Sequence, residues 1–459
     1  MRIVVTLSVL ALLQACSSVA NIQNQPAQQQ AASEYRIDKL ALSEQRSSKT
    51  TVVLAFSGGG TRAAAMSYGV LKALRDTSVI IDGSERRLLD EVDIISSVSG
   101  GSFTAAYFGL NGEYIFEDFE DDFLNRDVSG ALLHGLFSPR LWFSKHGRTE
   151  MAIRYYEDIL FNGATFADLE AAGGPLLFIN ASDLAQGTRF SFTQEYFDLL
   201  CSDIADFPVA RAVTASSAVP VLFNPVILEN YEGCDGGAYE QQFGQSRQHD
   251  STQTQQLFDD LHSYSDKVNR RYIHLVDGGI TDNLGLLAIH ETTEAMGGVA
   301  AVMERLNMEP SPTFLVISVN ASTKPQYNLG KRKRPPSIEA AVSAMSDVQL
   351  HRYNAATIDL IKQRLEDWDE ELGDGAIDTH HYFVDLSFEA ITDVDRLQFI
   401  NQIPTSFNLD EEQVDEVIKA GQNLLFSHPE FQRFLDDMHS LELGKFKGSF
   451  SSGTPDVGD

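Results

Sequence analysis

Cysteine is scarce in this chain: 459 residues contain three, and none of them lies in a CxxC pair or a Cys/His-rich cluster. That scarcity excludes a disulfide-dense scaffold and a zinc-finger type of site, so we predict no zinc site. We also expect no other metal and no cofactor. Basic residues are also few, because 35 Lys and Arg stand against 65 Asp and Glu, a formal net charge of −30. Such a surface repels phosphate backbones, so nucleic acid is excluded as a partner.

The N-terminal apolar run, residues 3–13, is too short to cross a bilayer as a helix and follows a single basic residue. We interpret residues 1–15 as a signal peptide. The run ends in Leu-Gln-Ala before Cys16, which resembles the lipobox of bacterial lipoproteins and predicts lipidation of Cys16 and attachment to the membrane through that lipid. Ser17 then favours the outer membrane of a Gram-negative cell envelope. The alternative is an ordinary secretory signal.

Composition divides the rest of the chain. Residues 16–35 are polar and rich in Gln and Ala, which is typical of a flexible tether, and the globular part is expected over 36–450. Residues 238–270 predict an exposed insertion, a candidate lid, and 451–459 a disordered tail. The one dense basic run, 331–334, is either a solvated loop or a membrane contact that faces phosphates.

Cys201 and Cys234 remain if Cys16 is acylated. Export would place them in an oxidising compartment, where they are close enough in sequence to close a loop around residues 215–220. The sequence leaves two alternatives open, a disulfide and two free thiols.

Short apolar runs alternate with helical patterns along the globular part. Runs that stop at glycines or polar residues predict buried strands at 51–56, 92–98, 176–180, 272–276 and 314–319, and helical spacing predicts helices over 61–75 and 103–110. A helix is also expected from Ser337 towards Trp368. This alternation predicts an α/β fold with a mainly parallel sheet covered on both faces.

Three segments could carry chemistry. Gly58-Gly59-Gly60 lies between a predicted strand and a helix, where backbone N–H groups can converge on an anion such as a phosphate or a tetrahedral oxyanion. Ser99, followed by two glycines, occupies the strand-to-helix turn of a nucleophile elbow, although Ser97 replaces the usual first glycine. Asp277-Gly278-Gly279 ends a further strand, where a carboxylate could accept the serine proton directly.

Together, Gly-Gly-Gly-x-Arg, the Ser-x-Gly elbow and the downstream Asp-Gly-Gly resemble the patatin-like phospholipase family over roughly residues 50–290. Two further stretches fit that pattern, at 215–220 and 277–285. The resemblance implies a three-layer α/β/α sandwich, Ser99 as nucleophile, Asp277 as its base and an oxyanion hole from Gly58, Gly59 and Gly60. It implies that Arg62 either supports the glycine loop or meets a substrate phosphate, and a structural salt bridge is the alternative. No metal is needed for the chemistry in the patatin branch.

The expected function is that of a serine lipid acyl hydrolase of the phospholipase A or lysophospholipase type, acting on phospholipid or another acyl-ester lipid. One alternative is an α/β-hydrolase esterase with a Ser-Asp-His triad. It would need a histidine after the acid; His274 and the pair at 380–381 are interpreted as structural or surface residues. A non-catalytic lipoprotein scaffold is a second alternative, and acyl transfer to an acceptor other than water is a third.

Overall fold

A computed structural model of the chain describes residues 21–27, 35–37, 46–81, 83–128, 130, 147–220, 222–234, 251–305, 313–324, 333–372 and 380–450. The predicted signal peptide, the predicted lipidation site at Cys16 and the predicted tail at 451–459 lie outside the described residues. So do residues 235–250 of the predicted insertion.

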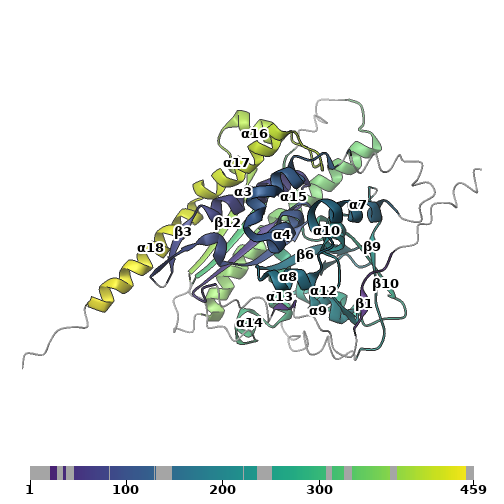
Figure 1. Cartoon of the computed structure of the whole chain (residues 1–459), viewed down its shortest axis with the longest axis horizontal. Helices are drawn as coiled ribbons and strands as arrows, with labels where there is room; N and C mark the ends of the chain where they lie inside the picture. Colours follow the sequence, from purple (N-terminus) through teal and green to yellow (C-terminus); the bar gives the residue numbers. More distant parts are fainter. Residues whose placement is uncertain are drawn as a thin grey trace, which may run out of the picture.

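One mixed sheet of eight strands forms the centre of the molecule (Figure 1). Seven strands lie in the order β12-β11-β2-β5-β6-β10-β9, and β7 pairs with β6. Their bounds are β2 Thr50–Phe56, β5 Val92–Val98, β6 Leu176–Asp183, β7 Thr188–Ser191, β9 Val226–Glu229, β10 Tyr272–Asp277, β11 Thr313–Asn320 and β12 His380–Ser387. The strands from β12 to β6 run parallel, whereas β10 is antiparallel to both β6 and β9.

Strand β2 shows why helices cover both faces of this sheet. Val52 and Leu54 belong to a core shared with helices α3 (Thr61–Arg75) and α17 (Glu411–Ser427). Val53 and Ala55, which point the other way, belong to a core shared with α13 (Leu286–Ala295) and α15 (Ile338–Leu372). Alternate side chains of one strand therefore enter two cores, as they must in a three-layer fold. The predicted α/β/α sandwich with a mainly parallel sheet is confirmed.

Helices α3 and α17 pack with their backbones in close approach. A Cβ on Gly69 would lie 2.3 Å from the carbonyl oxygen of Ile418, and a Cβ on Gly421 would lie 2.5 Å from that of Met66. Only glycine fits at either position, so the C-terminal part of the chain is fixed to the helix that follows the glycine loop.

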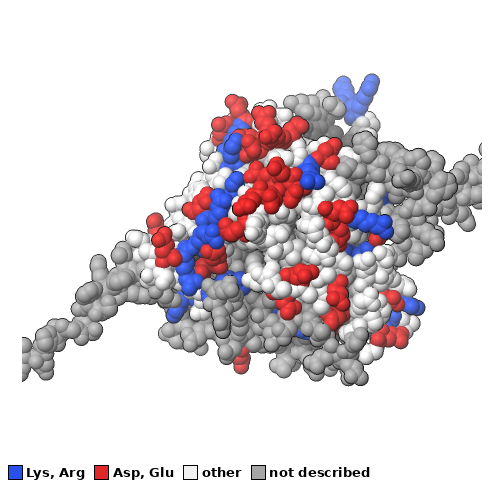
Figure 2. Space-filling model, in the orientation of Figure 1, with Lys and Arg blue, Asp and Glu red and all other residues white. Residues whose placement is uncertain are grey.

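The remaining helices and the small hairpin surround these layers. They are β3 Ser78–Ile81 paired with β4 Ser84–Arg87, α4 Gly100–Asn111, α5 Ile115–Phe119, α7 Arg148–Tyr156, α8 Phe166–Ala172, α9 Gln194–Leu199, α10 Val209–Ser216, α12 Thr252–Ser263, α14 Val299–Arg305, α16 Val394–Ile400 and α18 Pro429–Phe450. None of the helices in the described ranges is both long and apolar enough to cross a membrane. Figure 2 shows acidic side chains gathered over α16 and α17, as the net charge predicts.

Three sequence-based expectations need correction. Residues 21–27, predicted as part of a flexible tether, lie against the body, because β1 (Gln25–Pro26) pairs with β8 (Ser202–Asp203). Part of the predicted exposed insertion is packed, because Leu257, Phe258 and Leu261 of α12 are buried. His380 and His381 belong to the edge strand β12, which the sequence analysis did not predict.

Candidate active site

Ser99 lies in a sharp turn between β5 and α4. Its φ of 50° and ψ of −118° fall outside the regions that side chains with a Cβ normally occupy. The turn is possible because of the glycines that follow: a Cβ on Gly100 would lie 2.0 Å from the carbonyl oxygen of Gly60. A Cβ on Gly101 would lie 2.8 Å from that of Ser57. The elbow therefore packs directly against the glycine loop, as a nucleophile elbow requires.

Asp277 reaches Ser99 by a route that the sequence did not predict. The sequence analysis predicted a mainly parallel sheet, but β10, which ends in Asp277, runs antiparallel to β6. The register of the strands still brings the two residues together, because Asp277 pairs with Ala181 while Val98 pairs with the adjacent Asn180. The end of β10 thus lies level with the end of β5, one strand away across β6.

The two side chains meet in a direct hydrogen bond. Ser99 Oγ donates to Asp277 Oδ2 across 2.9 Å, and both residues are nearly buried, with 5% and 9% exposure. The other carboxylate oxygen, Oδ1, accepts the N–H of Gly279 at 2.8 Å. Burial raises the pKa of Asp277 to about 6, against the opposing effect of these two hydrogen bonds. A carboxylate with that pKa is a stronger base than an ordinary aspartate and is still ionised at neutral pH.

The glycine loop has a different arrangement of donors from the predicted one. The N–H of Gly58 donates to the carbonyl oxygen of Asn283 at 2.9 Å, so it is occupied in this structure. The amides of Gly59 and Gly60 have no hydrogen-bond partner within the described part of the chain. Their φ values of 144° and 62° are accessible to glycine and disfavoured for other residues. Two of the three predicted donors are therefore available to an oxyanion.

Gly58 contributes through its lack of a side chain. A Cβ at this position would lie 2.8 Å from Asn283 Oδ1 and 3.4 Å from the Cβ of Ser99. A side chain here would displace the Asn283 side chain and contact Ser99, so glycine keeps the space beside Ser99 open. The sequence analysis predicted Gly58 as an oxyanion donor; the structure places it beside Ser99 with its N–H already bonded to the carbonyl oxygen of Asn283.

Arg62 supports the loop. The side chain is buried, and its Nε and Nη1 atoms donate to the carbonyl oxygens of Ala321 and Ile403 at 2.9 and 2.6 Å. Nη2 donates to Thr405 Oγ1 at 3.0 Å. Burial lowers the pKa of Arg62 to about 10. The guanidinium thus joins the glycine loop to two distant segments, and of the two predicted roles the geometry favours loop support over contact with a phosphate.

The sequence analysis did not identify two residues, Ser216 and Asn180, whose hydrogen bonds support the turn at Ser99. The backbone N–H of Ser99 donates to Ser216 Oγ at 2.9 Å, and Ser216 Oγ donates to the carbonyl oxygen of Asn180 at 2.6 Å. The Asn180 amide donates to Ser96 Oγ at 2.9 Å and to the carbonyl oxygen of Ser97 at 3.1 Å. The resemblance of residues 215–220 to the family pattern pointed to this segment, but a sequence pattern does not show which residues Ser216 contacts.

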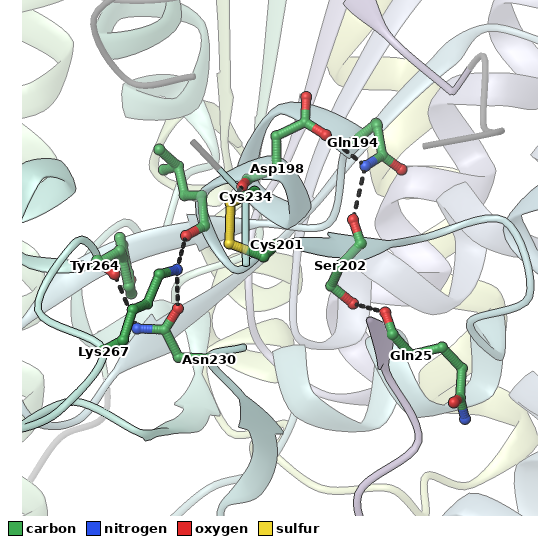
Figure 3. Close-up of a disulfide and its surroundings, with 10 residues drawn as sticks. Gln25, Gln194, Asp198, Cys201, Ser202, Asn230, Cys234, Tyr264 and Lys267 are labelled. Carbon is green, nitrogen blue, oxygen red and sulfur yellow. Dashed lines mark hydrogen bonds between the residues drawn. A yellow bond between two sulfur atoms is a disulfide. The ribbon is translucent and has the colours of Figure 1, made fainter. Parts of the chain in front are cut away.

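A disulfide and several hydrogen bonds join residues 24–27, 201–203, 230–234 and Lys267, and we name this region the disulfide seam (Figure 3). Cys201 and Cys234 form a disulfide, so of the two alternatives left open by the sequence the bridge is present. Asn24 donates to Ser202 Oγ and to the carbonyl oxygen of Glu229, at 3.2 and 2.8 Å. The N-terminal segment is thus attached beside the disulfide.

The seam also contains Lys267. Its ammonium donates to the carbonyl oxygen of Leu199 and to Asn230 Oδ1, at 2.6 and 2.5 Å (Figure 3). Burial lowers the pKa of Lys267 to about 8. Its neutral partners and its position at the seam indicate a structural role.

The structure does not favour a Ser-Asp-His triad. Within the described ranges, no histidine hydrogen-bonds to Ser99 or Asp277, and both oxygens of the Asp277 carboxylate have partners. The described residues also contain no group of three or more His, Cys, Asp or Glu that could hold a metal ion.

Part of the chain is similar to a known protein family. Residues 54–241 match the family described as patatin-like phospholipase, a segment that contains the glycine loop and Ser99 and ends before Asp277. No curated protein sequence matches the chain significantly. Solved structures of human GIVD cytosolic phospholipase A2 match with 14% identity and a TM-score of 0.44, over 85% of this chain and 60% of that one. The same protein in complex with methyl gamma-linolenyl fluorophosphonate matches with 12% identity and a TM-score of 0.40, over 87% and 60%.

Proposed function

We propose, from the match of residues 54–241 to the patatin-like phospholipase family, that the chain is a serine lipid acyl hydrolase with a Ser99–Asp277 dyad. The family supports lipid acyl hydrolysis in general. The substrate we propose is a phospholipid or lysophospholipid, whose acyl ester is cleaved to release a fatty acid.

The observation that carries the dyad is the 2.9 Å hydrogen bond from Ser99 Oγ to Asp277 Oδ2. Asp277 lies beyond the matched segment, so the geometry provides independent support for the second member of the pair. A serine whose proton already points at a buried carboxylate can act without a histidine, since the carboxylate accepts that proton as the oxygen attacks.

Acylation follows from this arrangement. Ser99 Oγ forms a bond to the ester carbonyl carbon while its proton passes to Asp277, and the carbonyl electrons move onto oxygen. The N–H groups of Gly59 and Gly60 are the free donors beside that oxygen and stabilise its charge. When the intermediate collapses, the ester bond breaks and the leaving alcohol takes the proton from Asp277, which leaves the acyl group on Ser99.

Deacylation reverses the roles. Water attacks the acyl carbon as Asp277 accepts one of its protons, and the second tetrahedral intermediate is stabilised by the same loop. Its collapse breaks the bond to Ser99 Oγ, which takes the proton back, and the fatty acid leaves.

We also propose that the protein is exported and anchored through a lipid on Cys16. The Cys201–Cys234 bridge supports export, because disulfides persist in oxidising compartments. Asn21 follows Cys16 by five positions and already contacts the body through Arg211. Such a short link reaches at most about 18 Å, so an anchor at Cys16 would hold the catalytic domain close to a membrane surface.

The test is mass spectrometry of lipid products from mixed phospholipids, with wild type and Ser99→Ala compared. We expect fatty acid and lysolipid from the wild type and none above background from the variant. Ser84→Ala, at an exposed serine on β4, is the matched control and should behave as wild type. Equal product release by Ser99→Ala, or none by the wild type, would refute the proposal.

A further inference from the structure

The first half of helix α15 presents apolar side chains to solvent. Met345 and Val348 are 59% and 56% exposed, and Ala341 and Arg352 are exposed on the same face, one turn to either side. Large apolar residues grouped on one helix face are a mark of an interaction surface. Of the described side chains on this part of α15, the one carboxylate, that of Asp347, interacts electrostatically with Arg62 and His351.

Basic side chains lie at the start of this helix. Lys333 and Arg334 are exposed and precede α15 by a few residues, and Arg352 is exposed at the other end of the apolar group. These cations are unusual in a chain with a formal net charge of −30. Such a protein is repelled by anionic surfaces as a whole, so a positive segment is where it can approach one.

Hydrogen bonds connect helix α15 to the glycine loop. Asn354 Nδ2 donates to Ser322 Oγ at 3.2 Å, and Ser322 Oγ also accepts from Asn283 Nδ2 at 3.5 Å. Asn283 in turn accepts the N–H of Gly58. This path leads from α15 to the glycine beside Ser99 in three hydrogen bonds. Ile280, three residues after Asp277, is itself 53% exposed.

We propose that Met345, Val348, Lys333 and Arg334 form a surface that docks onto a phospholipid bilayer next to the catalytic dyad; this inference rests on the proposed lipid hydrolase function. The two apolar side chains insert between head groups, and the two cations contact lipid phosphates. Docking there places the bilayer against the helix whose hydrogen bonds lead to the glycine loop beside Ser99.

The bilayer fits this surface better than a protein partner does. Cations beside an apolar helix face are the pattern by which peripheral proteins bind lipid, where apolar burial and attraction to anionic head groups act together. A second copy of the chain would bring another strongly acidic surface, which lacks this combination.

The experiment uses the full chain with Cys16→Ser, so that binding reports the surface and not an acyl anchor. Ser99→Ala in this background measures binding to phosphatidylcholine vesicles with and without phosphatidylglycerol, independently of turnover. Active protein is assayed on the same vesicles and on p-nitrophenyl butyrate, which dissolves as single molecules. The variants are Met345→Asp/Val348→Asp and Lys333→Glu/Arg334→Glu, and Val268→Asp, at an 82% exposed valine outside this surface, is the control.

We expect Met345→Asp/Val348→Asp to lower vesicle binding and vesicle hydrolysis about tenfold. Lys333→Glu/Arg334→Glu should lower both by a similar factor only where phosphatidylglycerol is present, since the net attraction depends on lipid charge. Turnover of the soluble ester should stay within about twofold in every variant. Val268→Asp should match the wild type throughout.

Equal losses on vesicles and soluble ester, or none on vesicles, would overturn the docking surface. So would a shift from dimer to monomer in Met345→Asp/Val348→Asp by analytical ultracentrifugation, because the face would then join two copies. A failure of the proposed function gives a different result. If the wild type hydrolyses neither substrate, the proposed function is wrong, and vesicle binding by the Ser99→Ala protein still tests the docking surface.

Discussion

Ser99 and Cys201 both have a positive φ, 50° and 52°, but they lie in regions that are held together differently. At the disulfide seam, Cys201 is fixed by a covalent bond to Cys234. At the end of β5, which we name the catalytic edge for the proposed dyad of Ser99 and Asp277, Ser99 is held by hydrogen bonds and by close backbone contacts that Gly100 and Gly101 allow. In the disulfide seam, the Cys201 side chain is consumed by the covalent bond that holds its backbone. At the catalytic edge, the backbone of Ser99 is held by other groups, so its hydroxyl is not covalently bound.

The largest effect should come from removing the base at the catalytic edge. Asp277→Asn keeps the size of the side chain but cannot accept the serine proton, so kcat/KM on a soluble ester should fall about 10³- to 10⁴-fold. Circular dichroism should show an unchanged fold. A variant that retained a tenth of wild-type activity would show that Asp277 is not the base.

The opposite pattern is expected at the seam. Replacing both cysteines (Cys201→Ser/Cys234→Ser) opens a loop of 33 residues and should lower the free energy of unfolding by about 2–4 kcal/mol. Ester turnover at 25 °C should stay within about twofold, because the disulfide touches neither dyad residue. Urea denaturation and steady-state kinetics on the same samples check this. A loss of turnover in fully folded protein would erase the distinction between the two regions.

The pH dependence tests the burial of Asp277. Its pKa is raised to about 6, and the carboxylate must be ionised to accept a proton, so activity is lost as the pH falls below that value. We expect kcat/KM on an uncharged ester to be level above pH 7 and about tenfold lower at pH 5. An inflection near the ordinary aspartate pKa, close to pH 4, would contradict this environment for the base.

The smallest effect concerns backbone strain at the elbow. Ser99→Gly removes the Cβ from a φ of 50° and should raise the free energy of unfolding by about 1 kcal/mol, while activity is lost. Ser99→Ala, which keeps the Cβ, should be equally inactive without that gain. If thermal denaturation places both variants level with the wild type, the elbow stores no strain.

Local patterns predicted much of the fold. The run at 92–98 forms strand β5 with the expected bounds, and the helix predicted over 61–75 is α3. These elements could be found because glycines and polar residues end each apolar run, and that information is local. Ser99 and Asp277 were proposed as site residues for the same reason, since each lies where a strand stops at glycines.

What the sequence could not supply was long-range pairing. The antiparallel direction of β10, and the register that places Asp277 level with Val98, depend on contacts between residues far apart in the chain. Two hydrogen bonds also depend on long-range contacts: Asn283 accepts from the N–H of Gly58, and Ser216 accepts from the N–H of Ser99. The N-terminal segment looked like a tether because its composition is polar, and its pairing with Ser202 is invisible in that composition.

Fluorophosphonate labelling tests the central claim most directly, because the reagent reacts with a serine activated as a nucleophile. Intact-mass and peptide analysis should find one adduct, on Ser99, in the wild type, none in Ser99→Ala, and a labelling rate reduced at least a hundredfold in Asp277→Asn, as expected for loss of a general base. An adduct on another serine, or Asp277→Asn labelled at the wild-type rate, would contradict a nucleophile activated by direct contact with Asp277.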